Sequence, residues 1–262
     1  MGRNRWFLPI ASSIGFFFLY APILSLVIFS FNANRLVTVW SGFSTQAYAD
    51  LWADPQLLPA ALLSLQIAAV SASIALVLGT LCAVALVRFR KFRGKTVLQA
   101  TVSAPLVMPD VITGIALLLL FVTMQGLIGW PAGRGVVTII LAHSTFCTAY
   151  VTVVVQSRLA DFDLSLEEAA MDLGASPVRV FFDITLPIIA PALVSGWLLA
   201  FTLSLDDLVI ASFVSGPGSS TLPMIIFSKV RLGVAPEVNA LATIIIGVVA
   251  LGVVVATIYG LR

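Results

Sequence analysis

One stretch, from Glu167 to Pro187, reads EEAAMDLGASPVRVFFDITLP, and the rest of the chain is organised around it. The chain of 262 residues is 60% hydrophobic and only 10% charged, so a polar island of this size stands out. The other substantial island, RFRKFRGK at residues 88–95, is nearly all basic and is explained as an anchor beside a membrane span. The acidic island places carboxylates around a small apolar stripe, which indicates a shaped protein surface in a membrane protein.

The composition around this stretch predicts a polytopic membrane protein. The mean hydropathy is +1.10, and the apolar share far exceeds that of an ordinary soluble domain. A helix needs about 20 apolar residues to cross the hydrocarbon, because lipid cannot satisfy exposed backbone groups. The formal net charge of +2 gives no argument for nucleic acid, since the basic residues cluster beside spans. Cys82 and Cys147 lie in apolar runs and are interpreted as small core residues.

We therefore predict an all-α membrane protein with six transmembrane helices. They run at about residues 7–31, 57–87, 97–123, 136–156, 188–213 and 239–260. The third span contains Pro105 and Pro109, so its helix should bend or break near Met108. We divide the chain into residues 1–56, a first span with a periplasmic interfacial loop, and residues 57–262, a core that includes the loop at 160–187.

The distribution of basic residues predicts the topology, because lysine and arginine favour the cytoplasmic side. Ten of the fourteen fall on the side of the acidic loop, namely Arg3, Arg5, Arg88, Arg90, Lys91, Arg93, Lys95, Arg158, Arg179 and Arg262. The other four are Arg35, Arg134, Lys229 and Arg231. Both termini and the acidic loop are therefore predicted to be cytoplasmic.

The local pattern of the acidic island predicts two short helices joined by a tight turn. Ser165 and Glu168 have the spacing of a capping box, which would start the first helix. Gly174 supplies a left-handed stop, and Ser176-Pro177 begins the second helix. Alanines between the acids would let a partner protein approach closely and bind the flanking carboxylates. An ordinary surface hairpin joining two spans is an alternative for the same residues.

The run Glu168-Ala169-Ala170, followed by Gly174 and by ITLP at residues 184–187, resembles the EAA loop of the permease subunits of bacterial ATP-binding-cassette (ABC) importers. The resemblance implies a type I importer permease fold, in which this loop is a coupling helix seated on a separate ATPase subunit. The residues assigned to that contact are Glu167, Glu168, Ala169, Ala170, Asp172 and Gly174.

Two further stretches are similar to the polyamine branch of these permeases, and most similar to the second permease of putrescine-type importers. They are APLVMPDVITG at residues 104–114 and LLAFTLSLDDLVIASFVSGPGSSTLP at residues 198–223. The resemblance implies a bacterial inner membrane location and a second, homologous permease subunit as partner in a heterodimer. It also implies two copies of a cytoplasmic ATPase subunit and a periplasmic polyamine-binding protein. It implies no cofactor and no nucleic acid.

Three acids, Asp110, Asp206 and Asp207, lie within predicted spans, where a carboxylate is costly and marks a functional site by default. No lysine or arginine lies well inside a span to neutralise them. They are candidates for a path that carries a di- or tricationic amine, and Trp197 and Phe201 could offer their ring faces to the same cation. Structural alternatives stay open: one of the adjacent aspartates caps a helix break or pairs with a partner's basic residue, and the two rings pack in the core or against lipid.

The remaining motifs predict no nucleotide site, metal site or catalytic site. Gly94-Lys95-Thr96 lacks the earlier glycine of a phosphate-binding loop. His143 is the only histidine, and near Ser144, Thr145 and Thr148 it is expected to be hydrogen-bonded rather than a metal ligand. No Ser-His-acid arrangement is predicted, so the sequence favours a non-enzymatic transport subunit. The alternatives are an ion-coupled secondary transporter that uses the intramembrane aspartates, and an ABC permease for another small cationic solute.

Overall fold

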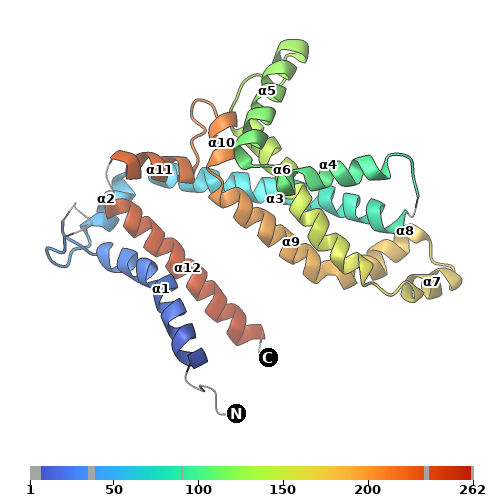
Figure 1. Cartoon of the computed structure of the whole chain (residues 1–262), viewed down its shortest axis with the longest axis horizontal. Helices are drawn as coiled ribbons and strands as arrows, with labels where there is room; N and C mark the ends of the chain where they lie inside the picture. The colour runs from blue at the N-terminus through green and yellow to red at the C-terminus, as the bar shows by residue number, and fades with distance from the viewer. Residues whose placement is uncertain (1–6, 35–38, 90, 233–235, 261–262) are drawn as a thin grey trace. The chain divides into compact units, whose positions relative to one another are not determined.

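The computed structural model describes residues 7–34, 39–89, 91–232 and 236–260 (Figure 1). These residues form helices and no strand, apart from one isolated bridge between Asn32 and Phe43. The helices are α1 (Phe7–Phe29), α2 (Gln46–Ala53), α3 (Leu57–Arg88), α4 (Lys95–Val107), α5 (Asp110–Ile128), α6 (Val136–Ala160), α7 (Ser165–Asp172), α8 (Pro177–Val180), the π-helical turn η1 (Phe181–Thr185), α9 (Leu186–Asp206), α10 (Val209–Val214), α11 (Leu222–Leu232) and α12 (Pro236–Gly260). Five basic residues used for the predicted topology lie outside the described residues: Arg3, Arg5, Arg35, Arg90 and Arg262.

Six helical segments in the described chain are long and apolar enough to cross a membrane, so the predicted number of spans is confirmed. They are Phe7–Phe29, Leu57–Arg88, Asp110–Ile128, Val136–Ala160, Pro177–Asp206 and Pro236–Val255. The fifth begins earlier than predicted, because α8, η1 and α9 follow one another without a break. The acidic island therefore leads directly into a membrane span.

The third span is broken where the prolines predicted it. α4 ends at Val107 and α5 begins at Asp110, and Met108 between them is extended, with ψ of 135°. Proline has no amide to donate, and its ring disfavours the helical conformation of the residue before it, so Pro109 ends α4 at this point. The apolar segment that can cross the membrane is therefore α5, which starts later in the chain than the predicted span.

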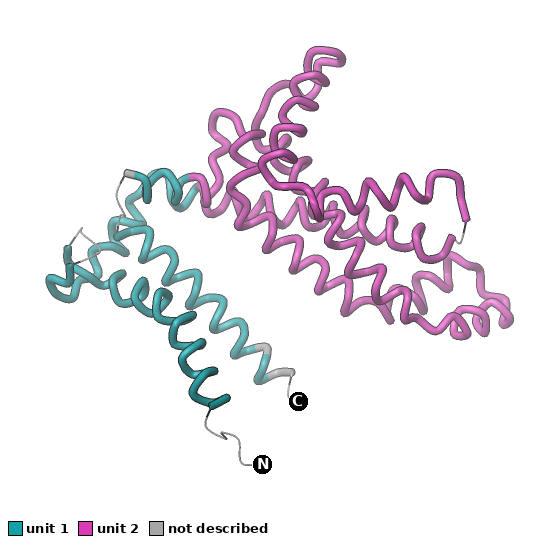
Figure 2. The backbone as a smooth tube through the Cα atoms, in the orientation of Figure 1, with its two compact units in different colours: residues 1–59, 225–262 teal, residues 60–224 magenta. Residues whose placement is uncertain are grey.

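The chain divides into two compact units, which Figure 2 shows in separate colours. Unit 1 consists of residues 1–59 and 225–262, and unit 2 consists of residues 60–224. In unit 1, α12 packs against α1 and α2. The acidic island, the broken third span and all three intramembrane aspartates belong to unit 2.

A small cluster of ion pairs ties three elements of unit 1 together. Nζ of Lys229, in α11, donates to Oδ2 of Asp54 at 2.6 Å and to Oε1 of Glu237 at 3.4 Å. Asp54 follows α2, and its Oδ1 also accepts from the amides of Gln56 and Leu57 at the start of α3. Glu237 lies in the first turn of α12. The cluster therefore joins the ends of α2, α11 and α12.

This cluster should make the stability of unit 1 depend on pH. Burial opposes ionisation of Asp54, but Lys229 and two backbone amides hold the pKa of that carboxyl below its ordinary value of 3.8. Burial also opposes the charged form of Lys229, but Asp54 and Glu237 raise the pKa of the amine above its ordinary value of 10.5. The stabilisation is thus complete between these two ordinary values. It is lost as pH falls through the folded pKa of Asp54 or rises through that of Lys229.

We expect Lys229→Met to destabilise the purified protein at neutral pH by about 2 kcal/mol, because two carboxylates lose their charged donor. The deficit should shrink as pH falls below 3.8, where Asp54 takes up its proton in both proteins. Thermal unfolding in detergent over a series of acidic pH values measures this. Arg231→Met is the matched control, since the Arg231 guanidinium lies over the ring of Phe227. A deficit that stays constant with pH would assign Lys229 a packing role instead.

The centre of unit 2 is α6, which packs against α4, α9 and α10 (Figure 1). Its contact with α3 is close, because a Cβ added to Gly79 would lie 2.7 Å from Cγ1 of Val151. Small residues allow such approaches between helices in membranes. Both cysteines are free thiols. Cys147 is buried in this core, as predicted, whereas Cys82 is only half-buried.

Candidate functional site

The fifth predicted span is interrupted at its pair of aspartates. α9 ends at Asp206 and α10 begins at Val209, so Asp207 and Leu208 lie in the break. Asp207 accepts from the amide of Ile210 through Oδ1 at 3.3 Å and from the amide of Ala211 through Oδ2 at 2.7 Å. The first amides of a helix have no partner within it, and a carboxylate at this position satisfies them. Asp207 therefore caps α10, which was one of the structural alternatives for this pair.

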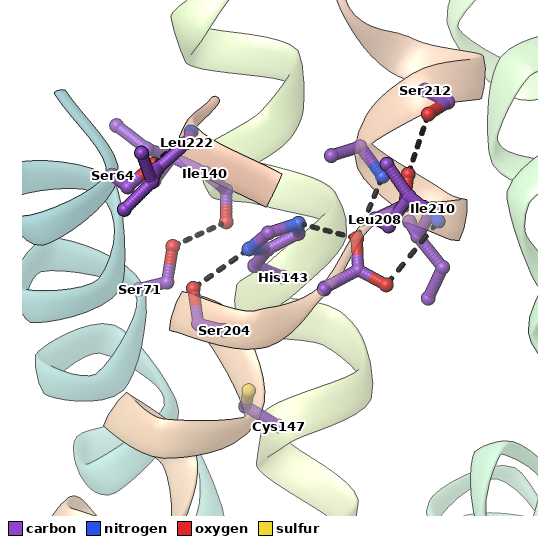
Figure 3. A network of polar contacts seen from close by, with 12 residues as sticks. Ser64, Ser71, Ile140, His143, Cys147, Ser204, Leu208, Ile210, Ser212 and Leu222 are labelled. Carbon is purple, nitrogen blue, oxygen red and sulfur yellow. Dashed lines mark hydrogen bonds and ion pairs between the residues drawn. The ribbon is translucent and has the colours of Figure 1, made fainter. Parts of the chain in front are cut away.

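Asp207 is also held by His143 of α6, which Figure 3 shows beside Ser204. Nε2 of His143 lies 3.2 Å from Oδ2 of Asp207, and Nδ1 lies 2.7 Å from Oγ of Ser204. Because a carboxylate only accepts, Nε2 carries the hydrogen, and in the neutral ring Nδ1 accepts from the Ser204 hydroxyl. His143 is fully buried. The expected hydrogen-bonded role is confirmed, but its partners come from the fifth span and not from the neighbouring residues of α6.

Ser204, His143 and Asp207 thus form a Ser-His-acid arrangement, which the sequence analysis did not predict. The serine and the histidine lie 61 positions apart in the chain, so no local motif joins them. A nucleophile must be within reach of its substrate, and both Ser204 and His143 are buried among helices. The arrangement therefore acts as a clamp that joins α6 to the end of α9 and the start of α10.

A cavity of about 310 Å³ lies beside this break. Its wall brings together the three acids that the sequence analysis selected: Asp110, at the start of α5, and Asp206 and Asp207. The rest of the wall is formed by Pro105, Thr113, Phe146, Tyr150, Leu203, Leu208, Val209 and Ile210. Two interrupted helices, the α4–α5 pair and the α9–α10 pair, therefore converge on one cavity. Irregular backbone at membrane depth is tolerated where it lines such a space.

The three carboxylates differ in how far their charge is already compensated. The side chain of Asp207 is 8% exposed and accepts from two amides and from His143. In the part of the chain that the structure describes, no lysine or arginine forms an ion pair with Asp110 or Asp206. A cation that enters the cavity would meet these two exposed carboxylates on its wall and be attracted to both. The chemistry that the cavity supports is therefore cation binding.

The two aromatic residues proposed for the path, Trp197 and Phe201, lie outside the lining of this cavity. Trp197 and Phe201 stack with ring centroids 5.2 Å apart and pack against the core, and Nε1 of Trp197 donates to Oγ of Ser73. Neither is among the described residues that line the cavity. Phe146 and Tyr150 do line it, and the sequence analysis missed them. They lie four positions apart on α6, so one helical face presents both rings, and this spacing was the available signal.

The acidic island begins differently from the prediction. The amide of Ser165 donates to Oδ1 of Asp163 at 3.0 Å, and the amide of Glu168 donates to the carbonyl oxygen of Leu164 at 3.1 Å. The first of these bonds, with a further one from the Ser165 side chain, lowers the pKa of Asp163. The predicted capping box is therefore wrong. Asp163, two residues earlier, takes the amide that Glu168 would have bound.

The end of α7 agrees with the prediction. Gly174 has φ of +87°, and its amide donates to the Met171 carbonyl at 2.9 Å while the amide of Ala175 donates to the Ala170 carbonyl at 3.1 Å. This pair of bonds defines a Schellman end. Ser176 then caps α8 by accepting from the amide of Arg179, with Pro177 as the first helical residue. The predicted turn and second helix are confirmed.

The surface of α7 presents apolar and acidic side chains together. Leu173 is 90% exposed, and Leu166 and Met171 are exposed as well. These residues lie outside the candidate spans, and exposed apolar patches in such positions mark protein contacts. The other residues of the predicted coupling surface differ in how exposed their side chains are. Glu168, Ala169 and Asp172 are exposed, Ala170 is half-buried, and Glu167 contacts Arg88.

Comparison with known proteins places these features in a family. A family model described as "Binding-protein-dependent transport system inner membrane component" matches residues 75–261. The sequence is 63% identical, over 247 residues, to the putrescine transport system permease protein PotI of Escherichia coli (strain K12). That match covers 94% of this chain and 88% of the relative.

Two further comparisons extend the likeness. The spermidine/putrescine transport system permease protein PotC of Haemophilus influenzae is 47% identical over 229 residues, which cover 87% of this chain and 86% of that protein. Among solved structures, a chain of a bacterial ABC transporter involved in the import of the acidic polysaccharide alginate matches with a TM-score of 0.74. It covers 99% of this chain and 98% of its own length at 17% identity, and it shows the fold alone.

Proposed function

Since the chain belongs to the family of binding-protein-dependent transport system inner membrane components, we propose that it is a permease subunit of an ATP-driven importer for polyamines such as putrescine or spermidine. It lies in the bacterial inner membrane and carries out no chemistry on its cargo. It forms half of the translocation path, and separate subunits hydrolyse ATP.

One observation carries the cargo assignment: the cavity between the two interrupted helices is lined by three carboxylates. The carboxylate of Asp207 already accepts hydrogen bonds from two amides of α10 and from His143. We therefore assign the binding of a ligand to Asp110 and Asp206. A diamine carries two positive charges on a short apolar chain. It can place its ammonium groups against these carboxylates while its methylenes contact Leu203, and the ring faces of Phe146 or Tyr150 can add cation–π attraction.

The α7 surface supports the second half of the proposal, which is that the acidic island docks on an ATPase subunit. Exposed Leu173 and Met171 supply apolar contact, and Glu168 and Asp172 supply charge beside them. The Gly174 turn fixes the angle between α7 and α8. Because α8 continues through η1 into α9, a displacement of α7 and α8 would also displace α9, the helix that ends at Asp206.

The contact between Arg88 and Glu167 and the charge pattern support a proposed orientation in the membrane. Arg88 at the end of α3 contacts Glu167, so the basic island and the acidic island lie at one end of unit 2. Basic residues favour the cytoplasm, which supports a cytoplasmic acidic loop and cytoplasmic termini. The partners would be a second homologous permease, two copies of a cytoplasmic ATPase subunit and a periplasmic polyamine-binding protein. Each ATP cycle would then open the path alternately to the two sides.

We expect ATP inside membrane vesicles to drive putrescine uptake after the proton gradient has been collapsed with an ionophore. The rival hypothesis, a secondary transporter in which the aspartates carry protons, requires that gradient. The measurement is uptake of labelled putrescine by right-side-out vesicles that contain the complete complex. The vesicles are loaded with ATP or with a non-hydrolysable analogue. Uptake that needs the gradient and ignores ATP would contradict the proposal.

Competition in the same vesicles separates polyamines from other small cationic solutes. An excess of spermidine should suppress putrescine uptake, because both present ammonium groups on a flexible apolar chain. An equal excess of lysine carries a carboxylate that Asp110 and Asp206 would repel, so it should leave uptake unchanged. Equal suppression by lysine would favour a general permease for small cations.

A further inference from the structure

Among the residues that the structure describes, Glu167 is the one acid of the predicted coupling surface whose carboxylate binds other side chains. Its Oε1 accepts from Nη2 of Arg88 at 2.6 Å and also from the Thr185 hydroxyl. Arg88 is the last residue of α3, Glu167 lies in the first turn of α7, and Thr185 is the last residue of η1. A single carboxylate oxygen therefore connects α7 both to η1, 18 positions along the chain, and to α3, 79 positions away.

The surroundings make this contact stronger than a surface ion pair. The side chains of Arg88 and Glu167 are 18% and 17% exposed, and Thr185 is buried. The Arg88 guanidinium also lies 5.0 Å from the centre of the Phe162 ring. The next ion pair along the same segment, Arg179 with Asp183, is 76% and 62% exposed. Water screens an exposed pair and leaves little net attraction, so the two pairs differ in their capacity to hold a helix.

Apolar packing does little to hold α7. None of its residues is buried. A cavity of about 570 Å³ lies beneath it, lined by Met171 of α7, by Val84 and Arg88 of α3, and by Phe181 and Phe182 of η1. The polar contact at Glu167 is therefore the main link between α7 and the helices above it.

The position of Thr185 gives this link a direction. η1 is a π-helical turn, and such turns inside α-helices are frequently found at functional sites. It is followed at once by α9, which runs unbroken to Asp206 at the first cavity. A displacement of Glu167 is thus passed to the start of α9 through Thr185 and to the end of α3 through Arg88.

We propose that Arg88, Glu167 and Thr185 form a transmission node, which converts movement of α7 into movement of α3 and α9. Glu167 is then a positioning residue that acts within the chain, while Glu168 and Asp172 face the ATPase subunit. The inference rests on the proposed function, because it takes the ATPase as the source of the movement. The node would tie the energy-receiving surface to the carboxylates that hold the cargo.

The test is the number of putrescine molecules imported per ATP hydrolysed by the complete complex in proteoliposomes. Glu167→Ala and Arg88→Ala should each lower this ratio by about tenfold, a typical size for a coupling between sites. ATP hydrolysis should continue, and the ATPase subunits should still co-purify. The double variant should be no worse than either single one, because both remove the same contact. Asp183→Ala, which breaks the exposed pair, is the matched control and should leave the ratio unchanged.

Thr185→Val tests the same contact if the alanine variants fail to accumulate in the membrane. It keeps the shape of the side chain and removes only the hydroxyl donor. It should lower the same ratio by about tenfold, as expected for a lost hydrogen bond to a charged group. An unchanged ratio in Glu167→Ala or Thr185→Val would overturn the node. Loss of the ATPase subunits from the Glu167→Ala complex would also overturn it, since Glu167 would then be a docking contact. Failure of the unmodified complex to use ATP would instead refute the proposed function.

Discussion

Replacing Asp206 with asparagine is expected to lower polyamine uptake by about 30-fold, the equivalent of about 2 kcal/mol of lost attraction for the cargo. Asp206 ends α9 and lines the 310 Å³ cavity, and no lysine or arginine in the described chain pairs with it. No cationic side chain of the described residues therefore neutralises its charge. The amide of asparagine keeps the shape of the side chain and removes only that charge. Initial rates of putrescine uptake at several concentrations measure the effect.

The controls for this variant separate charge from shape and from site. Asp206→Glu retains the charge one methylene further from the backbone and should restore much of the uptake. Asp50→Asn removes an exposed acid of α2 that bonds only to Gln46 among the contacts described, and it should leave uptake unchanged. If Asp206→Asn transports normally while the protein accumulates normally, the carboxylate has no part in the path.

The neighbouring aspartate should respond in a different way. Asp207 accepts from two backbone amides and from His143, so an asparagine there would turn a donor group toward at least one donor. The lost hydrogen bonds would destabilise the α9–α10 break and so impair folding. We therefore expect Asp207→Asn to lower the amount of protein in the membrane more than the transport rate per molecule. Asp110 resembles Asp206 in this respect, since it lines the same cavity without a lysine or arginine partner in the described chain.

The sequence was sufficient for features that depend on one segment at a time. Apolar runs predicted six spans, Pro105 and Pro109 predicted the break near Met108, and Gly174 predicted the left-handed end of α7. Each follows from a local rule: the length of a span, the missing amide of proline, and the absence of a Cβ in glycine. The acids of the cavity were also selected one by one, because a carboxylate in an apolar run is costly wherever it lies.

The features that the sequence did not yield depend on which helix faces which. His143 was correctly expected to be hydrogen-bonded, but Ser204 and Asp207 reach it only because α6 packs against α9. The position of α6 also brings Phe146 and Tyr150 to the cavity wall, and a separate approach of α9 to α3 places Trp197 against Ser73. The capping box failed for a smaller reason. Two competing acceptors, Asp163 and Glu168, could reach one amide, and residue spacing alone does not decide between them.

Replacing Gly174 with valine is expected to lower ATP-driven uptake by about tenfold or more while the chain still inserts in the membrane. At φ of +87° a side chain strains the backbone, although a Cβ there would meet no atom within 4 Å. The left-handed conformation costs about 1 to 2 kcal/mol for an ordinary residue, and a β-branched one is stiffer. That is also the size of a typical coupling between two sites. The strain would break the Schellman bonds of Gly174 and Ala175 and tilt α7 away from α8.

Two further variants isolate the backbone conformation as the cause. Gly174→Asn should keep most of the uptake, because asparagine tolerates the left-handed region. Gly126→Val alters a glycine of α5 that also has no atom within 4 Å of an added Cβ but lacks the positive φ, and it should transport normally. Co-purification of the ATPase subunits with Gly174→Val then shows whether the lost uptake reflects lost docking. Normal uptake by Gly174→Val would mean that the angle between α7 and α8 is set elsewhere, and the Glu167 contact with Arg88 would be the remaining candidate.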